Sequence, residues 1–172
     1  MVKAHGNCRL FCPAVFESFG YFFVRLGGTM PVKLIAHVLL TVADSHLIIQ
    51  RSQIKRGKPN VFPQYWDIPG GRVEENELPR DAAVRECFEE TGISLAKENL
   101  TIIHEDSQFD DEKEAVFTRL VYEVKLPEQP KTILLDPEEH TDFLWITSRD
   151  ENKKNLVPYL DEILEKRRKN GF

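Results

Sequence analysis

The sequence predicts an α/β fold in which a mixed sheet lies between helices, an α/β/α sandwich. Runs of Val, Ile and Leu at 32–40 and 46–50 have the length and composition of buried strands. Apolar residues recur at helical spacing within 79–91 and 155–168, so each of these segments is expected to form an amphipathic helix. Strands that alternate with two such helices can bury both faces of one sheet.

Length and composition indicate an ordinary soluble enzyme domain. The chain has 172 residues, of which 41% are hydrophobic and 30% charged, enough for one sizeable core but not for a second full domain. Its formal net charge of −5 argues against binding to nucleic-acid polymers, whose backbones attract basic surfaces. A small nucleotide remains compatible as substrate, because metal ions supply local positive charge. No apolar run is long enough to cross a membrane, so no membrane partner is expected.

Residues 1–29 differ in composition from the rest, and we interpret them as an N-terminal extension of unknown role before a domain at 30–172. Glu17 interrupts the apolar stretch in this extension, so a secretory signal is not indicated. Cys8 and Cys12 have no second pair of cysteines nearby and are only a weak zinc signal. Three cysteines in the whole chain favour a reducing, cytoplasmic compartment.

The segment after the first two strands is expected to be a loop. Residues 51–65 are polar and basic and contain several glycine and proline residues, which favour turns. This loop leads to Gly70 and Gly71, where the lack of a side chain lets the backbone pass close to a phosphate and a metal.

The helix predicted at 79–91 has recognisable ends. Pro79 suits a first helical turn, and Gly92 suits the residue after the last one. The apolar stripe of this helix is expected to consist of Ala83, Val84, Cys87 and Phe88.

The remaining elements follow from the same patterns. Residues 100–107 and 115–126 are predicted strands, with the acidic run 110–112 as the turn between them. A further short strand is expected at 143–146. The closing helix at 155–168 carries an apolar face formed by Leu156, Leu160, Ile163 and Leu164.

Three glutamates gather on one face of the helix at 79–91. Glu86, Glu89 and Glu90 stand at positions i, i+3 and i+4, where like charges repel one another. A bound cation would remove that repulsion, and carboxylates are suited to Mg²⁺ or Mn²⁺, which take phosphate oxygens at their remaining positions. The alternative is a solvated helix face on which Arg80 and Arg85 pair with the glutamates.

The order of the residues distinguishes these alternatives. From Gly71, five residues lead to Glu77, seven more lead to Arg-Glu at 85–86, and Cys-Phe-Glu-Glu-Thr-Gly-Ile follows at 87–93. This spacing resembles the Nudix box at every fixed position, with Cys87 as a mild departure in the first apolar slot. The chain is therefore identified as a member of the Nudix hydrolase family, with residues 30–172 as the family domain.

The resemblance implies a sandwich fold and hydrolysis of a phosphoanhydride in a nucleoside diphosphate linked to another group. It makes Glu86, Glu89 and Glu90 the expected ligands of Mg²⁺ or Mn²⁺, with Glu86 or a downstream glutamate as general base. Arg85 and Glu77 are expected to support the site together with Gly70 and Gly71.

A carboxylate from outside the box is also expected. Glu139, in the acidic stretch before the strand at 143–146, is our candidate, with plain surface charge as the alternative. His104 and His140 are interpreted as bystanders rather than catalysts.

Substrate choice is less determined by the sequence. The markers typical of ADP-ribose, dinucleoside polyphosphate and NADH hydrolases are missing after the box. The approach at 65–71 resembles family members that cleave nucleoside triphosphates, including oxidised ones. We therefore expect such a substrate, with an ADP-ribose or nucleotide-sugar pyrophosphatase as the alternative. Candidate substrate-binding residues are Arg51, Trp66 and Phe109, although Trp66, Phe109 and Phe143 are more typical of core positions.

Two further classes of Nudix relative fit the sequence less well. Isomerase relatives use a cysteine upstream of the box, and this chain has none between Cys12 and Cys87. A non-catalytic nucleotide sensor usually has a degraded box or an added DNA-binding domain, whereas the box here is intact. The resemblance also implies a homodimer, as in many family members.

Overall fold

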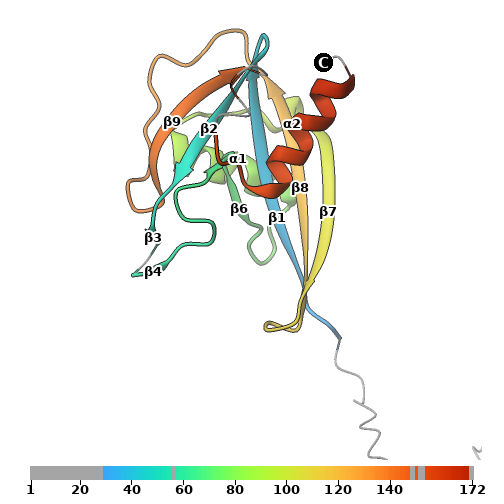
Figure 1. Ribbon diagram of the computed structural model, residues 1–172. Helices are drawn as coiled ribbons and strands as arrows, with labels where there is room; N and C mark the ends of the chain where they lie inside the picture. The colour runs from blue at the N-terminus through green and yellow to red at the C-terminus, as the bar shows by residue number, and fades with distance from the viewer. Residues whose placement is uncertain (1–28, 56, 148–149, 151–153, 171–172) are drawn as a thin grey trace, which may run out of the picture.

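One mixed sheet organises the molecule. The computed structural model describes residues 29–55, 57–147, 150 and 154–170 (Figure 1). Its helices and strands are β1 (Val32–Val42), β2 (Ser45–Arg51), β3 (Ile54–Lys55), β4 (Lys58–Pro59), β5 (Trp66–Asp67), β6 (Gly70–Arg72), α1 (Pro79–Thr91), η1 (Lys97–Asn99), β7 (Thr101–Asp110), β8 (Ala115–Lys125), β9 (His140–Thr147) and α2 (Pro158–Asn170). The main sheet has the strand order β5-β2-β1-β8-β7, with β6 paired to β1 and β9 paired to β2.

The sheet is mixed because its two longest strands run in the same direction. β1 and β8 pair in parallel from Val32 opposite Val116 to Thr41 opposite Lys125. The other strand pairs are antiparallel. A separate two-stranded ribbon, β3 and β4, projects from the segment between β2 and β5.

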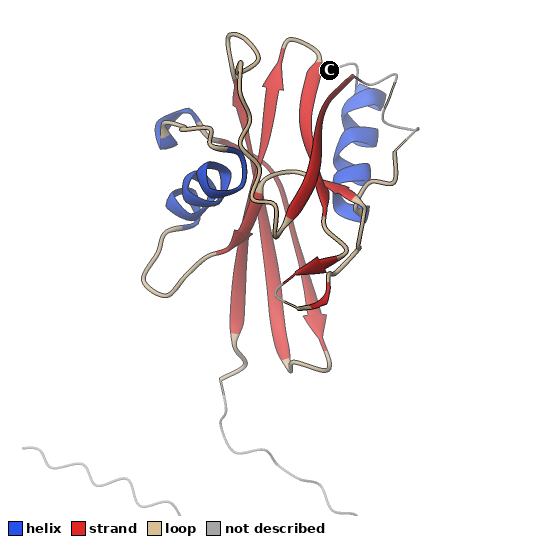
Figure 2. Ribbon diagram, turned by 90° about the vertical axis from the view of Figure 1, so that its left-hand side faces the viewer, coloured by secondary structure: helices blue, strands red, loops and turns tan. Residues whose placement is uncertain are grey.

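The helices cover opposite faces of the sheet, which confirms the predicted α/β/α sandwich (Figure 2). Alternate residues of β1 explain the two layers, since successive side chains of a strand point to opposite faces. Ala36, Val38 and Leu40 belong to the core cluster that contains Ala83 and Cys87 of α1.

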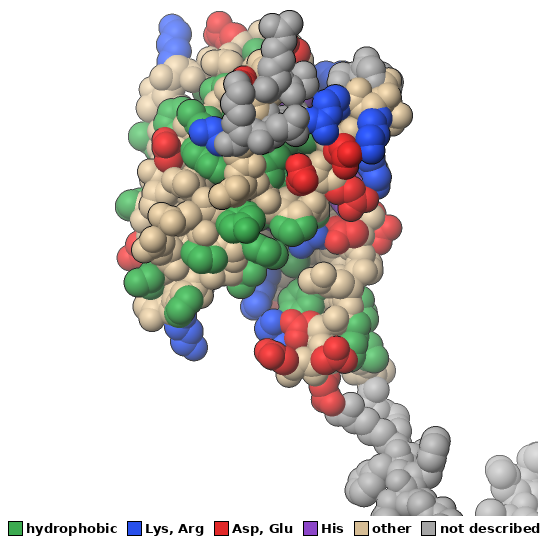
Figure 3. All heavy atoms as spheres, in the orientation of Figure 1, with side chains coloured by type: hydrophobic (Ala, Val, Ile, Leu, Met, Phe, Trp, Pro, Cys, Tyr) green, Lys and Arg blue, Asp and Glu red, His purple; other side chains and the backbone are tan. Residues whose placement is uncertain are grey.

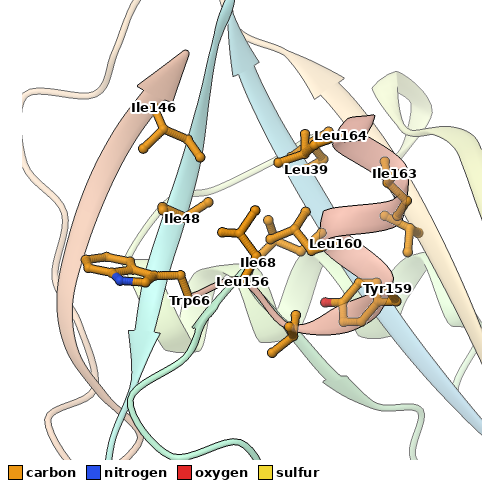
Figure 4. Packing of buried hydrophobic residues seen from close by; sticks show 12 residues of the cluster. Leu39, Ile48, Trp66, Ile68, Ile146, Leu156, Tyr159, Leu160, Ile163 and Leu164 are labelled. Atoms are coloured by element: carbon orange, nitrogen blue, oxygen red, sulfur yellow. The ribbon is translucent and has the colours of Figure 1, made fainter. Parts of the chain in front are cut away.

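Leu39 belongs to the second cluster, on the α2 side of the sheet. Figure 4 shows Leu160 and Leu164 of α2 directed toward the sheet residues Leu39 and Ile48. Each large side chain buried in this way contributes roughly 1.5–3 kcal/mol of transfer free energy.

The predicted elements can be compared with the observed ones. The helix at 79–91 is confirmed at both ends, and the closing helix begins at Pro158, later than expected. The strands predicted at 100–107 and 143–146 are longer than expected, and the turn between β7 and β8 lies at 111–114. The ribbon of β3 and β4 lies within the predicted loop.

One prediction about α1 was wrong. Phe88 was expected in the apolar stripe, yet it is 55% exposed, while Glu90 and Thr91 are buried beside Ala83 and Cys87. The helix is rotated so that Glu90 points toward β6, because Gly70 offers it a backbone hydrogen bond that an apolar side chain could not use.

The extension predicted at 1–29, including Cys8 and Cys12, falls almost entirely outside the described residues. Within the described part of the chain, no helix is both long and apolar enough to span a membrane.

Candidate active site

Gly71 and Glu86 bring β6 and α1 into direct contact. A Cβ atom on Gly71 would lie 2.5 Å from the carboxyl carbon of Glu86 and 2.6 Å from each of its oxygens. Gly70 is still more confined, because a Cβ there would lie 2.4 Å from the carbonyl oxygen of Ala36, and its φ of +155° suits glycine. The glycine pair therefore allows the backbone to reach the acidic face of α1.

The ends of α1 carry residues that favour the start and the stop of a helix. Pro79 occupies the first turn, as expected for a residue that lacks an N–H group. Gly92 adopts the left-handed conformation with φ of 72°, and its N–H donates to the carbonyl of Phe88 at 2.8 Å. Glu86 and Glu90 lie on the side of this helix that contacts β6, at Gly71 and Gly70 respectively.

Arg85 connects three of the glutamates. Its guanidinium donates to both carboxylate oxygens of Glu77, at 2.9 and 3.0 Å. It also donates to Glu86 at 2.8 Å and to Glu89 at 3.0 Å. The bonds to Glu77 are the first cause of the raised pKa of Arg85, so this side chain stays charged. Arg85 thus neutralises part of the repulsion on α1, as its position in the box led us to expect.

Glu90 is the most buried of the acidic residues on α1. It is 5% exposed, and its Oε2 accepts a hydrogen bond from the N–H of Gly70 at 2.8 Å. Burial raises the pKa of Glu90 well above its usual value, although the bond from Gly70 acts in the opposite direction. His140 Nε2 lies 3.8 Å from Glu90 Oε1, so this predicted bystander is a neighbour of the site.

Glu86 and Glu89 differ in their surroundings. The side chain of Glu86 is 16% exposed, and burial raises its pKa despite the opposing effect of Arg85. The side chain of Glu89 is 55% exposed. Glu86 and Glu90 therefore form the interior of the acidic cluster, and Glu89 lies at its rim.

Glu139 reaches the cluster from the segment before β9. The charge of Glu139 is among the influences that raise the pKa of both Glu86 and Glu90, behind burial as the main cause. Its side chain is 14% exposed and forms an ion pair with Lys55 of β3. Glu139 is thus nearly buried beside the acidic face of α1, unlike a plain surface charge.

Arg51 and Asp67 hold the loop beside the site. Arg51 donates to Asp67 at 2.8 Å, to the side chain of Asn60 at 3.0 Å and to the carbonyl of Val61 at 2.8 Å. Asp67 also accepts hydrogen bonds from Tyr159 of α2 and from the N–H of Ile68. Burial alone would raise the pKa of Asp67, but interactions with His37 and Arg51 hold it below its usual value. These contacts support a structural role for Arg51, which was predicted to bind substrate.

The two aromatic candidates lie in different places. Trp66 is 7% exposed and belongs to the core cluster on the α2 side. It is therefore a core residue, and its ring does not offer a stacking surface. Phe109 is 49% exposed near the end of β7, opposite Val116. Within the part of the chain that the structure describes, no hydrogen bond or ring contact joins Phe109 to the acidic cluster. Phe143 is 37% exposed, so neither phenylalanine is a core residue.

The carboxylates can hold a divalent ion only after they reorient. Across the described residues, no three acidic, histidine or cysteine side chains stand together as a ready metal site. The reason is visible in the contacts, since Arg85 holds Glu86 and Glu89, Gly70 binds Glu90, and Lys55 binds Glu139. The donor set is nonetheless all oxygen, which fits Mg²⁺ or Mn²⁺.

Several residues of the site were missed by sequence reasoning. Lys55, Asp67 and Tyr159 contact partners 84, 16 and 92 residues away in the chain. No local pattern marks such pairs. The basic character of the 51–65 loop was the one signal that could have pointed to Lys55.

The fold and the site together define a class: an α/β/α sandwich whose glycine turn touches a helix rich in carboxylates. A profile of the NUDIX domain matches residues 32–166. The chain belongs to the Nudix hydrolase family, as its sequence pattern predicted.

Individual relatives agree with this assignment. A putative 8-oxo-dGTP diphosphatase of Bacillus subtilis (strain 168) is 42% identical over 80 residues, which are 46% of this chain and 48% of the relative. The match thus spans about half the length of that curated relative.

Solved structures support the fold. A MutT protein from Methanosarcina mazei Go1 has a TM-score of 0.64 at 20% identity, covering 84% of this chain and 99% of the other. A bifunctional NMN adenylyltransferase/ADP ribose pyrophosphatase from Francisella tularensis, complexed with AMP and a Mn ion, has a TM-score of 0.58 at 24% identity. That match covers 84% of this chain and 43% of the other.

Proposed function

We propose that this chain hydrolyses a phosphoanhydride in a small nucleoside diphosphate-linked compound, with Mg²⁺ or Mn²⁺ as cofactor. The observation that carries the proposal is the arrangement of acidic residues at β6: Glu86 lies against Gly71, Glu90 binds Gly70, and the charge of Glu139 acts on both, with Glu89 at the rim. Nearly buried carboxylates that repel one another are hard to explain by stability alone. A divalent ion would offset their charge.

In this proposal, Glu86, Glu89 and Glu90 hold the ion, which when bound polarises phosphoryl oxygens and activates water. The lack of a side chain on Gly71 leaves room for the carboxylate of Glu86 between β6 and α1. Arg85 orients Glu86 through the hydrogen bond at 2.8 Å. Glu86 or Glu139 accepts the proton of the attacking water.

For the substrate we propose a nucleoside triphosphate, including oxidised ones. The exposed pair Phe62 and Tyr65, whose ring centroids are 5.5 Å apart, offers a surface on which a base can stack. Figure 3 shows apolar side chains gathered on the left of this face, toward β3, β4 and β9, with charged side chains around α2 on the right. Arg51 fixes the segment that carries this pair by binding the carbonyl of Val61.

The test is release of phosphate or pyrophosphate, measured with Mg²⁺ and with Mn²⁺. The panel contains dNTPs, 8-oxo-dGTP, ADP-ribose, dinucleoside polyphosphates, NADH and nucleotide sugars, with added phosphatase for products that are monophosphates. Metal-dependent turnover favouring a triphosphate supports the proposal. Preference for ADP-ribose or a nucleotide sugar would replace the substrate class, and nucleotide binding without any turnover would favour a sensor. The homodimer and the cytoplasmic location remain predictions.

A further inference from the structure

The ribbon of β3 and β4 places a cation beside the acidic cluster. Lys55, on β3, forms an ion pair with Glu139 in which the lysine side chain is 36% exposed and the glutamate 14% exposed. The two residues are 84 positions apart in the sequence. The partly exposed ammonium is thus the outer member of the pair and has solvent into which it can move.

The backbone around Glu139 is fixed. Its carbonyl accepts a hydrogen bond from the N–H of Ser52 at 2.8 Å, and its N–H donates to the carbonyl of Asp136 at 3.1 Å. Ser52 also donates from its hydroxyl to the carbonyl of Glu138 at 3.1 Å. Any change at Glu139 therefore takes place in its side chain, whose carboxylate can turn either to Lys55 or to the cluster on α1.

Arg85 and Lys55 differ in how firmly they are bound. Arg85 makes a bidentate pair with Glu77 and further bonds to Glu86 and Glu89, an arrangement that suits the planar guanidinium. Lys55 is a point charge on a flexible chain, and a partly exposed ion pair of this kind contributes little net stability. Lys55 is therefore the cation that a competing charge displaces more easily.

We propose that Lys55 is a counter-ion of Glu139 that competes with the divalent ion for this carboxylate. Lys55 is then a positioning residue: it occupies the carboxylate of Glu139, beside the other carboxylates, until an ion with twice the charge enters. The inference rests on the proposed function, because it needs a divalent ion at the glutamates of α1. It accounts for the orientation of Glu139 alone, since Arg85 and Gly70 hold the carboxylates of α1.

The test measures Mn²⁺ binding by electron paramagnetic resonance of the free ion, without substrate. Lys55→Met keeps an unbranched side chain of similar length but removes the charge, and Mn²⁺ should bind about fivefold more tightly, the range expected for loss of one partly exposed ion pair. Lys58→Met, on β4 of the same ribbon, is the matched control for loss of one positive charge. It should change the affinity less than twofold.

A double-mutant cycle locates the effect. Glu139→Gln should weaken Mn²⁺ binding. Adding Lys55→Met to it should have no further effect, because position 139 then has no carboxylate for which Lys55 and Mn²⁺ can compete. Circular dichroism verifies that each variant is folded, and Lys55→Gln repeats the test with a polar side chain.

The outcomes separate the two proposals. If the unaltered protein binds no Mn²⁺, the metal-dependent function itself fails. If it binds Mn²⁺ but Lys55→Met matches Lys58→Met, weakens binding, or acts equally in the Glu139→Gln background, the role of Lys55 is overturned while the metal site stands.

Discussion

Gly71 of β6 and Glu86 of α1 approach so closely that one methyl group on the glycine would lie 2.5 Å from the carboxyl carbon of the glutamate. The contact explains why a glycine stands at this position of the box. It also means that the glycine turn and the acidic helix pack directly against each other, so a side chain added to the turn displaces Glu86.

Gly71→Ala should therefore reduce activity without unfolding the protein. The added methyl meets the far end of a flexible side chain, so Glu86 can rotate away at a small free-energy cost but leaves its place in the site. We expect kcat to fall roughly 100-fold, within the range for a displaced catalytic group, with Tm nearly unchanged.

Gly70→Ala provides the contrast. Its methyl would meet the backbone of Ala36 and His37 at 2.4–2.5 Å, which cannot rotate away, so Tm should fall strongly. Equal Tm values for the two variants, measured by calorimetry, would contradict this view of the turn.

Glu90→Gln should stabilise the metal-free protein and inactivate it. Because burial raises the pKa of Glu90, its charged form is unfavourable in the folded state, and this loss of stability develops as pH rises above the unfolded pKa. The amide still accepts the hydrogen bond from Gly70. In EDTA at pH 7.5 we expect Tm to rise by about 2–4 °C, the shift that ~1 kcal/mol causes in a domain of this size.

The same variant should lose the stabilisation that Mn²⁺ gives, since it lacks a metal-binding carboxylate. Thermal melts with EDTA and with Mn²⁺ measure both effects. A lower Tm in EDTA would show that the negative charge of Glu90 does not destabilise the folded protein.

Arg85→Lys should impair the site although it conserves charge. A lysine cannot make the bidentate bonds to Glu77 while also binding Glu86, so the orientation of Glu86 is lost. We expect kcat/KM to fall about 10- to 100-fold at saturating metal. Arg80→Lys is the matched control on the same helix, because Arg80 packs over Tyr122 and lies outside the cluster. Similar steady-state losses in both variants would assign the effect to the helix rather than to the site.

Phe62→Ala should raise KM more than it lowers kcat if Phe62 supports the base. Loss of one stacking ring costs about 1–3 kcal/mol in nucleotide binding, which corresponds to a roughly 5- to 150-fold higher KM. Phe109→Ala is the control, since Phe109 is similarly exposed at the end of β7. If KM changes in the Phe109 variant instead, the base binds near Phe109, as the sequence predicted, and not near Phe62.

Three buried histidines should make the protein sensitive to mild acid. Burial lowers the pKa of His37, His46 and His140 from 6.5 to about 4. The unfolded chain therefore binds more protons between these values, and each histidine reduces stability as pH falls from about 6.5 to about 4.

His46→Gln isolates one of these contributions at a distance from the acidic cluster. His46 bonds to Thr41 at 3.1 Å, and its removal should reduce the loss of unfolding free energy between pH 7 and pH 4.5 by ~1–2 kcal/mol, allowing for partial exposure. Urea denaturation at the two pH values measures the difference. An unchanged pH dependence would mean that His46 is not neutral in the folded state.

Local patterns predicted much of the fold because the forces that set them act over a few residues. The helix at 79–91 follows from its apolar spacing and from Pro79 and Gly92 at its ends, and all of these lie within one short segment of the chain. Phe88 was placed wrongly because periodicity gives the width of a helix face but not its centre. The centre depends on Gly70, which lies in another element.

The sequence by itself determined the family, the sandwich and the spacing of the acidic residues, since each depends on residue types at fixed short separations. Only the tertiary structure decided which polar groups meet: Lys55 with Glu139, Arg51 with Asp67, and the N–H of Gly70 with Glu90. The physical reason is that these pairs form between strands and loops far apart in the chain. Their energies depend on burial and distance, and both exist only once the sheet has brought the segments together.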